Sequence, residues 1–252
     1  MSSKEKYDHL ANDYNKVRYR MGYYHDKAIK EIKRANIFPA WKTYDYIAHE
    51  SNNKYVIVFF VDNPYNINNP KVTFFLDYHD DKNNHYVVRW GASPYKQTPD
   101  SPFKLVRVLH VYEPHFFNRY KERFLKDNTL FANEVASRFL SRNDISVQIE
   151  ITEEINRNIG EYGKFGKLGY RVKDGMCFAK TVVEGMPSED GNHKNDKVEA
   201  ICIMYKTFVN DIMLFENHNK AIMQETWDKW TKSYIDFINE NNGNDITLTL
   251  EP

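Results

Sequence analysis

Cysteine is scarce in this chain, and the scarcity excludes two classes of protein. The 252 residues contain only Cys177 and Cys202, both within apolar stretches, and no CxxC pair. A disulfide-stapled secreted domain and a zinc ribbon both need more cysteines at regular spacings. We therefore expect two free thiols in a protein of a reducing compartment, with no bound metal and no cofactor.

Net charge and long apolar runs are also missing. The chain has 35 Lys and Arg against 35 Asp and Glu, whereas duplex-binding proteins usually carry a positive surplus that neutralises phosphates. No apolar stretch approaches the roughly 20 residues that span a bilayer, and the N-terminus lacks the apolar core of a signal peptide. We expect a cytoplasmic protein, or a virion component assembled there, without a membrane partner.

The first part of the chain predicts one long helix. Its apolar stripe, at spacings of three and four, consists of Tyr7, Leu10, Tyr14, Val17, Met21, Tyr24 and Ala28. Gly22 interrupts the pattern and Pro39 ends it. The stripe could pair with a second helix or cover the chain's own sheet. Consecutive Tyr positions suit a two-stranded coiled coil poorly, so we favour the sheet.

Strands dominate the segment after this helix. Aromatic and β-branched runs separated by turns rich in Asn and Asp predict an antiparallel meander in sequence order. These runs cover residues 43–48, 54–61, 72–78 and 85–90. A proline-spaced loop over residues 91–102 then leads to a fifth strand, 103–112.

The second half predicts helices followed by a second sheet unit. One helix begins at Glu113-Pro114, since Pro favours the first helical position, and the next is capped by Asp127 or Asn128. The apolar face of the second helix would hold Phe131, Val135 and Phe139. A strand over 145–151, a hairpin turning at 173–175 and a strand over 198–209 follow. The last helix would have as its apolar face Met223, Trp227, Trp230, Tyr234 and Phe237.

Strands that follow one another without alternating helices indicate an α+β fold. We expect a long N-terminal helix, an antiparallel meander sheet, and then helices packed with a second antiparallel hairpin-plus-strand unit. Residues 1–252 would form one unit. The best internal boundary is the loop 91–102, which separates the helix and meander of 1–90 from the helices and second sheet of 103–252.

His115, Arg119 and Arg123 form the most suggestive polar cluster. A spacing of four places them on one helix face. Histidine can shuttle a proton near neutral pH, and arginine can stabilise charge that develops on a phosphoryl group. The alternative is that these side chains form the solvated face that any amphipathic helix needs.

A family resemblance supports the catalytic interpretation of this cluster. The helix His115-Phe116-Phe117-Asn118-Arg119-Tyr120-Lys121-Glu122-Arg123, a hairpin around Gly175, and the strand Tyr205-Lys206-Thr207-Phe208 resemble the barnase–RelE–colicin group of small ribonuclease toxins. The resemblance covers residues 111–208. It implies RNA cleavage without metal through attack by the 2′-hydroxyl, with His115, Arg119, Arg123 and Thr207 at the phosphate.

Three other groups of polar residues are candidates for binding sites. Basic residues that include Lys164, Lys167 and Arg171 have aromatic residues between them, which is compatible with a surface for single-stranded nucleic acid. The alternative, to which we give equal weight, is surface charge scattered by chance. His110 and His115 flank Glu113 without matching HExxH, so they do not indicate a metal site. His79, Asp80, Asp81 and His85 surround a hairpin turn, and we interpret them as a solvated turn.

Two functions from different classes remain open. The neutral charge and the lack of strong motifs favour a non-catalytic interaction or structural protein, which would bind a protein partner or a second copy of itself. Residues 207–214 resemble uncharacterised proteins of phages and bacterial mobile elements. The alternative is a metal-independent, RNA-cleaving enzyme of the toxin type, for which RNA would be the partner.

The C-terminal helix yields the first testable prediction. If its aromatic face is buried, Trp230→Ala removes a large core side chain and lowers the free energy of unfolding by about 3–5 kcal/mol. Thermal melting of the variant beside the parent protein measures the loss. Identical melting curves would mean that Trp230 is exposed.

Overall fold

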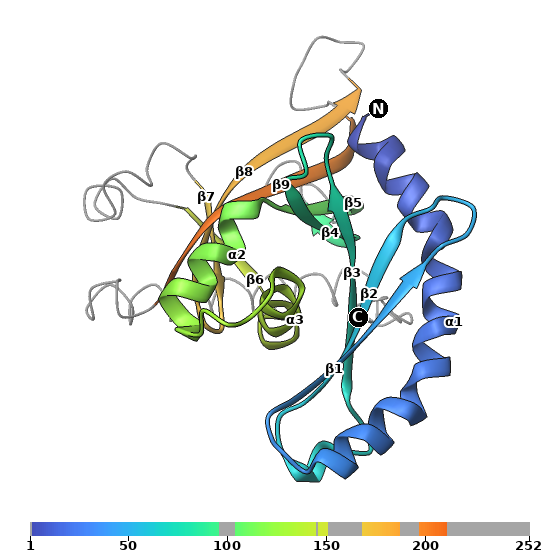
Figure 1. Cartoon of the computed structure of the whole chain (residues 1–252). Helices are drawn as coiled ribbons and strands as arrows, with labels where there is room; N and C mark the ends of the chain where they lie inside the picture. The colour runs from blue at the N-terminus through green and yellow to red at the C-terminus, as the bar shows by residue number, and fades with distance from the viewer. Residues whose placement is uncertain (1, 96–103, 145, 151–167, 187–196, 211–252) are drawn as a thin grey trace, which may run out of the picture.

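The computed structural model of the chain describes residues 2–95, 104–144, 146–150, 168–186 and 197–210. It has the expected α+β fold (Figure 1). The elements are α1 (Ser3–Ala35), β1 (Ala40–Ile47), β2 (Lys54–Val61), η1 (Pro64–Asn66), β3 (Lys71–His79), β4 (His85–Tyr95), β5 (Lys104–Tyr112), α2 (Pro114–Tyr120), η2 (Lys121–Leu125), α3 (Ala132–Arg142), β6 (Ser146–Glu150), β7 (Leu168–Val172), β8 (Gly175–Met186) and β9 (Lys197–Asn210).

All nine of these strands belong to one sheet, in the order β1-β2-β3-β4-β5-β9-β8-β7-β6. The first five pair antiparallel in sequence order, which confirms the predicted meander. The strands β6 to β9 pair antiparallel as well. The one parallel pair, β5 with β9, joins the two antiparallel units into a continuous sheet.

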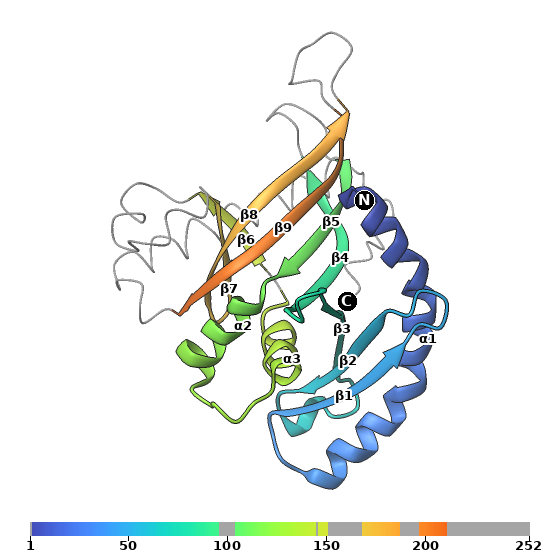
Figure 2. The ribbon, with the colours of Figure 1, turned by 45° about the horizontal axis from the view of Figure 1, so that its top comes forward.

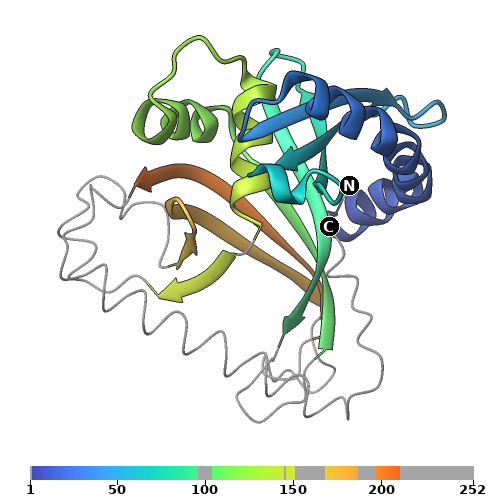
Figure 3. The ribbon, with the colours of Figure 1, turned by 90° about the horizontal axis from the view of Figure 1, so that it is seen from below.

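Helices cover both faces of the sheet, so there are two cores (Figures 1 and 3). Along β2, Tyr55, Ile57 and Phe59 point toward α1, while Val56 and Val58 point toward α3. Side chains alternate across a strand, and here both faces are buried. The continuous apolar run of β2 follows from this double cover.

The stripe on α1 packs on the chain's own sheet, as the sequence predicted. Leu10, Val17 and Ala28 are buried there, and the helix continues through Gly22 to Ala35. Ser2 caps the helix start by accepting a hydrogen bond from the Glu5 N–H. A second contact fixes the middle of the helix, since the Asp13 carboxylate accepts a 2.7 Å hydrogen bond from the Tyr55 hydroxyl.

The predicted loop over residues 91–102 is wrong for residues 91–95, which belong to a strand. β4 continues to Tyr95, which pairs with Lys104 of β5. Past Val88, β4 pairs with β5 but no longer with β3. Pro94 still pairs with Leu105 of β5, and proline is tolerated in a strand that has an unpaired edge, so Pro94 does not end β4.

The predicted cap of α3 is also wrong. The helix begins at Ala132, and Glu134 accepts a 2.8 Å hydrogen bond from the Phe131 N–H. Asp127 instead accepts hydrogen bonds from Thr129 in the preceding turn. Phe131 therefore precedes the helix and is 79% exposed, whereas Val135 and Phe139 are buried as expected.

Some predictions fall outside the described residues. These are the predicted binding residues Lys164 and Lys167 and the helix whose apolar face would run from Met223 to Phe237. A boundary within 91–102 stays a prediction. Within the described ranges, no helix has the length and apolarity that crossing a membrane requires.

Two glycines provide a matched stability test. A Cβ at Gly22, on the exposed side of α1, meets nothing within 4 Å, so Gly22→Ala should stabilise the protein by about 1 kcal/mol through helix propensity. The melting temperature should rise by about 2–4 °C. Gly175 has φ +155°, and a Cβ added there would lie 2.2 Å from the Val209 carbonyl oxygen. Gly175→Ala should therefore lower the melting temperature. Equal effects would contradict the prediction.

Candidate functional site

The candidate cluster lies on α2, whose start is tied to the sheet. Glu113 precedes the helix, and Pro114 occupies the first position as predicted. The Glu113 N–H donates a 3.1 Å hydrogen bond to the Tyr205 carbonyl oxygen of β9. The Glu113 carboxylate also forms an ion pair with the Lys206 ammonium. These two contacts fix the start of α2 beside the paired strands β5 and β9.

Aromatic rings hold the inner side of α2. Phe116, Phe117 and Tyr120 are all buried. The Tyr120 ring lies 5.0 Å from the rings of both Phe139 and Phe208 and meets each edge-on. Edge-to-face pairs favour defined ring positions, so α2 is packed tightly between α3 and β9 (Figure 2).

His115 and Arg119 lie on the outer side of this helix. Both are exposed. The Arg119 guanidinium donates a 2.9 Å hydrogen bond to Glu122, three residues along the helix. Exposed pairs of this kind contribute little stability. The Glu122 carboxylate nevertheless neutralises the positive charge of Arg119, which a bound phosphate would need.

Arg123 is directed differently. It sits in η2, a π-helical turn that continues α2, and donates a 2.6 Å hydrogen bond to the Phe208 carbonyl oxygen. The Asn210 side-chain amide donates a 2.6 Å hydrogen bond to the Arg123 carbonyl oxygen in return. These contacts attach the turn to the end of β9. Arg123 therefore has a structural role in fastening η2 to the sheet.

Thr207 does not face α2. Tyr205 and Phe208 both contact Phe116, although they are three residues apart. A β-bulge explains their common face, since Phe178 pairs with Thr207 and the next residue of β8 pairs with Tyr205. Neighbouring side chains alternate across a strand, so the side chain of Thr207, which is 6% exposed, lies on the opposite face from α2.

The structure therefore separates the four residues named from the sequence. His115 and Arg119 share the exposed side of α2, Arg123 reaches the backbone of β9, and Thr207 points away from the helix. Arg171, one of the basic residues considered for binding single-stranded nucleic acid, is 6% exposed and does not form an open surface. Lys164 and Lys167 lie outside the described residues.

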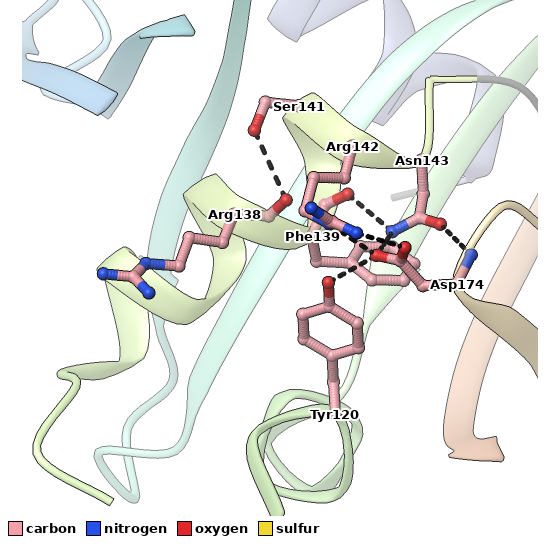
Figure 4. A network of polar contacts seen from close by, with 7 residues as sticks. All are labelled: Tyr120, Arg138, Phe139, Ser141, Arg142, Asn143 and Asp174. Atoms are coloured by element: carbon pink, nitrogen blue, oxygen red, sulfur yellow. Dashed lines mark hydrogen bonds and ion pairs between the residues drawn. The ribbon is translucent and has the colours of Figure 1, made fainter. Parts of the chain in front are cut away.

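A buried carboxylate that the sequence analysis did not single out lies behind α2. Asp174, in the turn between β7 and β8, accepts hydrogen bonds from the Tyr120 hydroxyl at 2.6 Å and the Asn143 amide at 2.9 Å. Arg142 binds both carboxylate oxygens, at 2.9 and 2.8 Å. In Figure 4 these three side chains converge on Asp174. One carboxylate thus connects α2, α3 and the hairpin turn.

The network also sets the charge of Asp174. Burial alone raises the pKa of this carboxyl group, but the hydrogen bonds from Arg142, Tyr120 and Asn143 outweigh it and hold the pKa below its ordinary value. Asp174 is therefore charged at neutral pH. The sequence signal was the Lys173-Asp174-Gly175 turn, which predicts a hairpin and says nothing of residues 31 or more positions away.

His110 is the most buried of the histidines near α2. Its Nδ1 lies 3.1 Å from the Tyr205 hydroxyl. Burial, together with the Arg89 guanidinium nearby, lowers the pKa of His110 to about 3. The ring is therefore neutral at pH 7 and is not suited to exchange protons near that pH.

A second polar cluster joins α3 to the meander. Asp77 Oδ2 accepts hydrogen bonds from the Lys54 ammonium at 3.0 Å and the Asn133 amide at 2.8 Å. His85 Nε2 lies 3.0 Å from the other carboxylate oxygen, Oδ1. The rings of His79 and His85 stack at 5.0 Å. His85 is thus half-buried against the Asp77 carboxylate and does not belong to a solvated turn. In the described ranges, no three or more His, Cys, Asp or Glu side chains form a group suited to a metal ion.

Comparison of the chain with protein-family models, curated proteins and solved structures finds no significant match. The resemblance of residues 111–208 to ribonuclease toxins and that of 207–214 to mobile-element proteins therefore stay predictions, which rest on the sequence.

The Asp174 network predicts a pH-dependent loss of stability. A carboxyl group whose pKa is lowered by folding contributes its full stability above the unfolded pKa of about 3.9, and loses it as the pH falls through the folded pKa. Asp174→Asn should lower the free energy of unfolding by about 3–5 kcal/mol at pH 7, because Arg142 loses its buried partner.

Chemical denaturation of both proteins from pH 7 to pH 2 tests this. The difference between parent and variant should be constant above about pH 5 and shrink below about pH 4. Asp81→Asn serves as the control: Asp81 is exposed, so the substitution should change stability little at any pH. A difference that grows toward acid would contradict the assignment.

Proposed function

We propose that this protein is a non-catalytic interaction or structural protein, of the kind that phages and mobile elements encode. The observation that carries the proposal is the position of Thr207, on the face of the sheet opposite to α2. A phosphate held by His115 and Arg119 on the outer side of α2 would have the sheet between it and the Thr207 hydroxyl. The geometry thus favours this function over RNA cleavage.

The contacts of the arginines support the same conclusion. Arg119 pairs with Glu122, and Arg123 binds the Phe208 carbonyl oxygen. A group that stabilises a transition state must be aimed at the charge that develops there. These two guanidiniums are instead directed at a helix neighbour and at the end of a strand.

The surface offers what an interaction protein needs. Large side chains that project into solvent from α1 and the adjoining segments are Tyr19, Tyr23, Ile37 and Ile47. Tyrosine is enriched in interaction surfaces because one ring supplies both apolar contact and a hydroxyl. Assignment to a phage or mobile element rests on the resemblance of residues 207–214, and a protein partner or self-association remains a prediction.

An RNA-cleavage assay tests the proposal. The purified protein is incubated with labelled single-stranded RNA in EDTA, and we expect no cleavage above a blank. His115→Ala should melt like the parent protein, because an exposed histidine contributes little packing. Cleavage by the parent that falls by ~10²–10⁴ in His115→Ala would overturn the proposal and establish the toxin-like alternative.

A further inference from the structure

The outer side of α1 carries tyrosines and cations in one line. At spacings of three and four, residues of a helix lie above one another on one face. We call this set the basic–tyrosine stripe: Tyr19, Tyr23, Lys27, Lys30, Lys33 and Arg34. All six side chains are exposed, Tyr19 by 72% and Tyr23 by 65%. From Tyr19 to Arg34 the stripe spans about 22 Å along the helix axis.

Apart from Lys27, whose ammonium lies 5.2 Å from the centroid of the Tyr44 ring of β1, the stripe faces away from the sheet. Val17, Ala28 and Ile32 hold the opposite side of α1 against β2 and its neighbours. No other described helix or strand lies over the outer side (Figures 1 and 2). Since the apolar side of α1 is already buried, the helix has no second apolar side to insert into a membrane.

Positive charge is concentrated here in a chain that is neutral overall. Residues 16–34 contain seven Lys and Arg against two acidic residues, Asp26 and Glu31, a surplus of five. Glu31 is engaged by Lys42 at 3.5 Å and by Lys27 at 3.9 Å, and Asp26 lies 3.4 Å from His25.

The cations at the end of the stripe are not engaged by Glu31, which pairs with Lys27 and Lys42. Lys30, Lys33 and Arg34 make no ion pair with any residue that the structure describes. Basic residues in the last turn also favour the helix dipole, which accounts for Lys33 and Arg34 but not for Lys30 or the tyrosines.

We infer that the basic–tyrosine stripe binds single-stranded nucleic acid. Exposed rings can stack on unpaired bases, and cations spaced along the helix can contact successive phosphates. An acidic polypeptide could pair with the cations but has no bases to stack on the tyrosines. The combination of exposed rings and cations therefore favours nucleic acid. The inference rests on the proposed function, a protein that binds without cleaving, and assigns to this surface a nucleic acid in place of the protein partner predicted from the sequence.

Binding is measured by the fluorescence anisotropy of a labelled 20-nucleotide single-stranded DNA, at 50 mM salt and with EDTA. DNA has no 2′-hydroxyl, so the measurement does not depend on whether the protein cleaves RNA. We expect a dissociation constant of about 1–100 μM, the range of sequence-independent binding. Three phosphate contacts should make log K fall with log salt at a slope of about −2.

Two kinds of variant separate stacking from charge. Tyr19→Ala/Tyr23→Ala should weaken binding at least tenfold, since stacking on one base can contribute about that much. Lys30→Gln/Lys33→Gln should reduce the salt slope by about 1.4. Tyr65→Ala, at a tyrosine that is 96% exposed in η1, is the matched control and should bind like the parent.

Gly22 offers the sharpest comparison, because it lies on the outer side between the two tyrosines and a Cβ there meets nothing within 4 Å. Gly22→Glu and Gly22→Gln have the same shape and both favour the helix. Gly22→Glu should weaken DNA binding severalfold relative to Gly22→Gln, although both variants melt above the parent.

Several outcomes would overturn the inference. They are no binding by the parent at 100 μM, equal binding by Tyr19→Ala/Tyr23→Ala, equal binding by the two Gly22 variants, or poly-glutamate binding as tightly as the oligonucleotide. The failures can be told apart. RNA cleavage by the parent removes the proposed function and leaves DNA binding measurable, whereas absent binding without cleavage removes only this inference.

Discussion

Parallel pairing between β5 and β9 is the contact on which the rest of the structure depends. Tyr112 pairs with Tyr205 in this register, and their rings stack at 4.4 Å with planes 8° apart. The pair joins two antiparallel units that are each local in sequence, because β5 closes the meander and β9 closes the C-terminal hairpin unit. Without it the apolar faces of both units would end at open edges, which natural sheets avoid. With it, both cores extend across the junction, and α2 gains the strand on which its aromatic side packs.

Asp174 holds together the elements that carry the candidate residues. Its carboxylate ties Tyr120 of α2 and Arg142 of α3 to a hairpin turn, and each group would be costly to leave buried without a partner. The network stabilises the inner side of α2 and leaves His115 and Arg119 on the outer side. A helix fixed in this way cannot rotate His115 toward the Thr207 face without breaking the network. The same polar bonds that stabilise the fold therefore argue against assembly of a cleavage site.

The proposed binding role depends on the opposite side of the molecule. Because α1 satisfies its apolar side against the sheet, its outer side is free to carry residues that stability does not demand. Solvation alone explains charged residues on a helix surface, but the rings of exposed tyrosines, unlike their hydroxyls, gain nothing from water. Their alignment with Lys30 and Arg34 is the feature that separates this helix from an ordinary amphipathic one. Neutral overall charge and a locally basic surface are compatible, since attraction to phosphates falls off within about 10 Å at 0.1 M salt.

Periodicity along the sequence was enough to determine α1, the antiparallel meander, the 173–175 hairpin and β9, because each depends on residues a few positions apart. Local signals failed where a competing contact, near or far along the chain, decided the outcome. Pro94 remains in a strand because its neighbouring edge is unpaired, and α3 begins at Ala132 because Glu134 caps the Phe131 N–H, although Asp127 is the better local signal. The candidate cluster shows the same limit. Spacing correctly placed His115 and Arg119 on one helix side, but a one-residue bulge at Lys206 and the β5–β9 pairing decided where Thr207 points. Such pairings close loops of many residues and leave no mark on neighbouring positions, so only the tertiary structure could decide them.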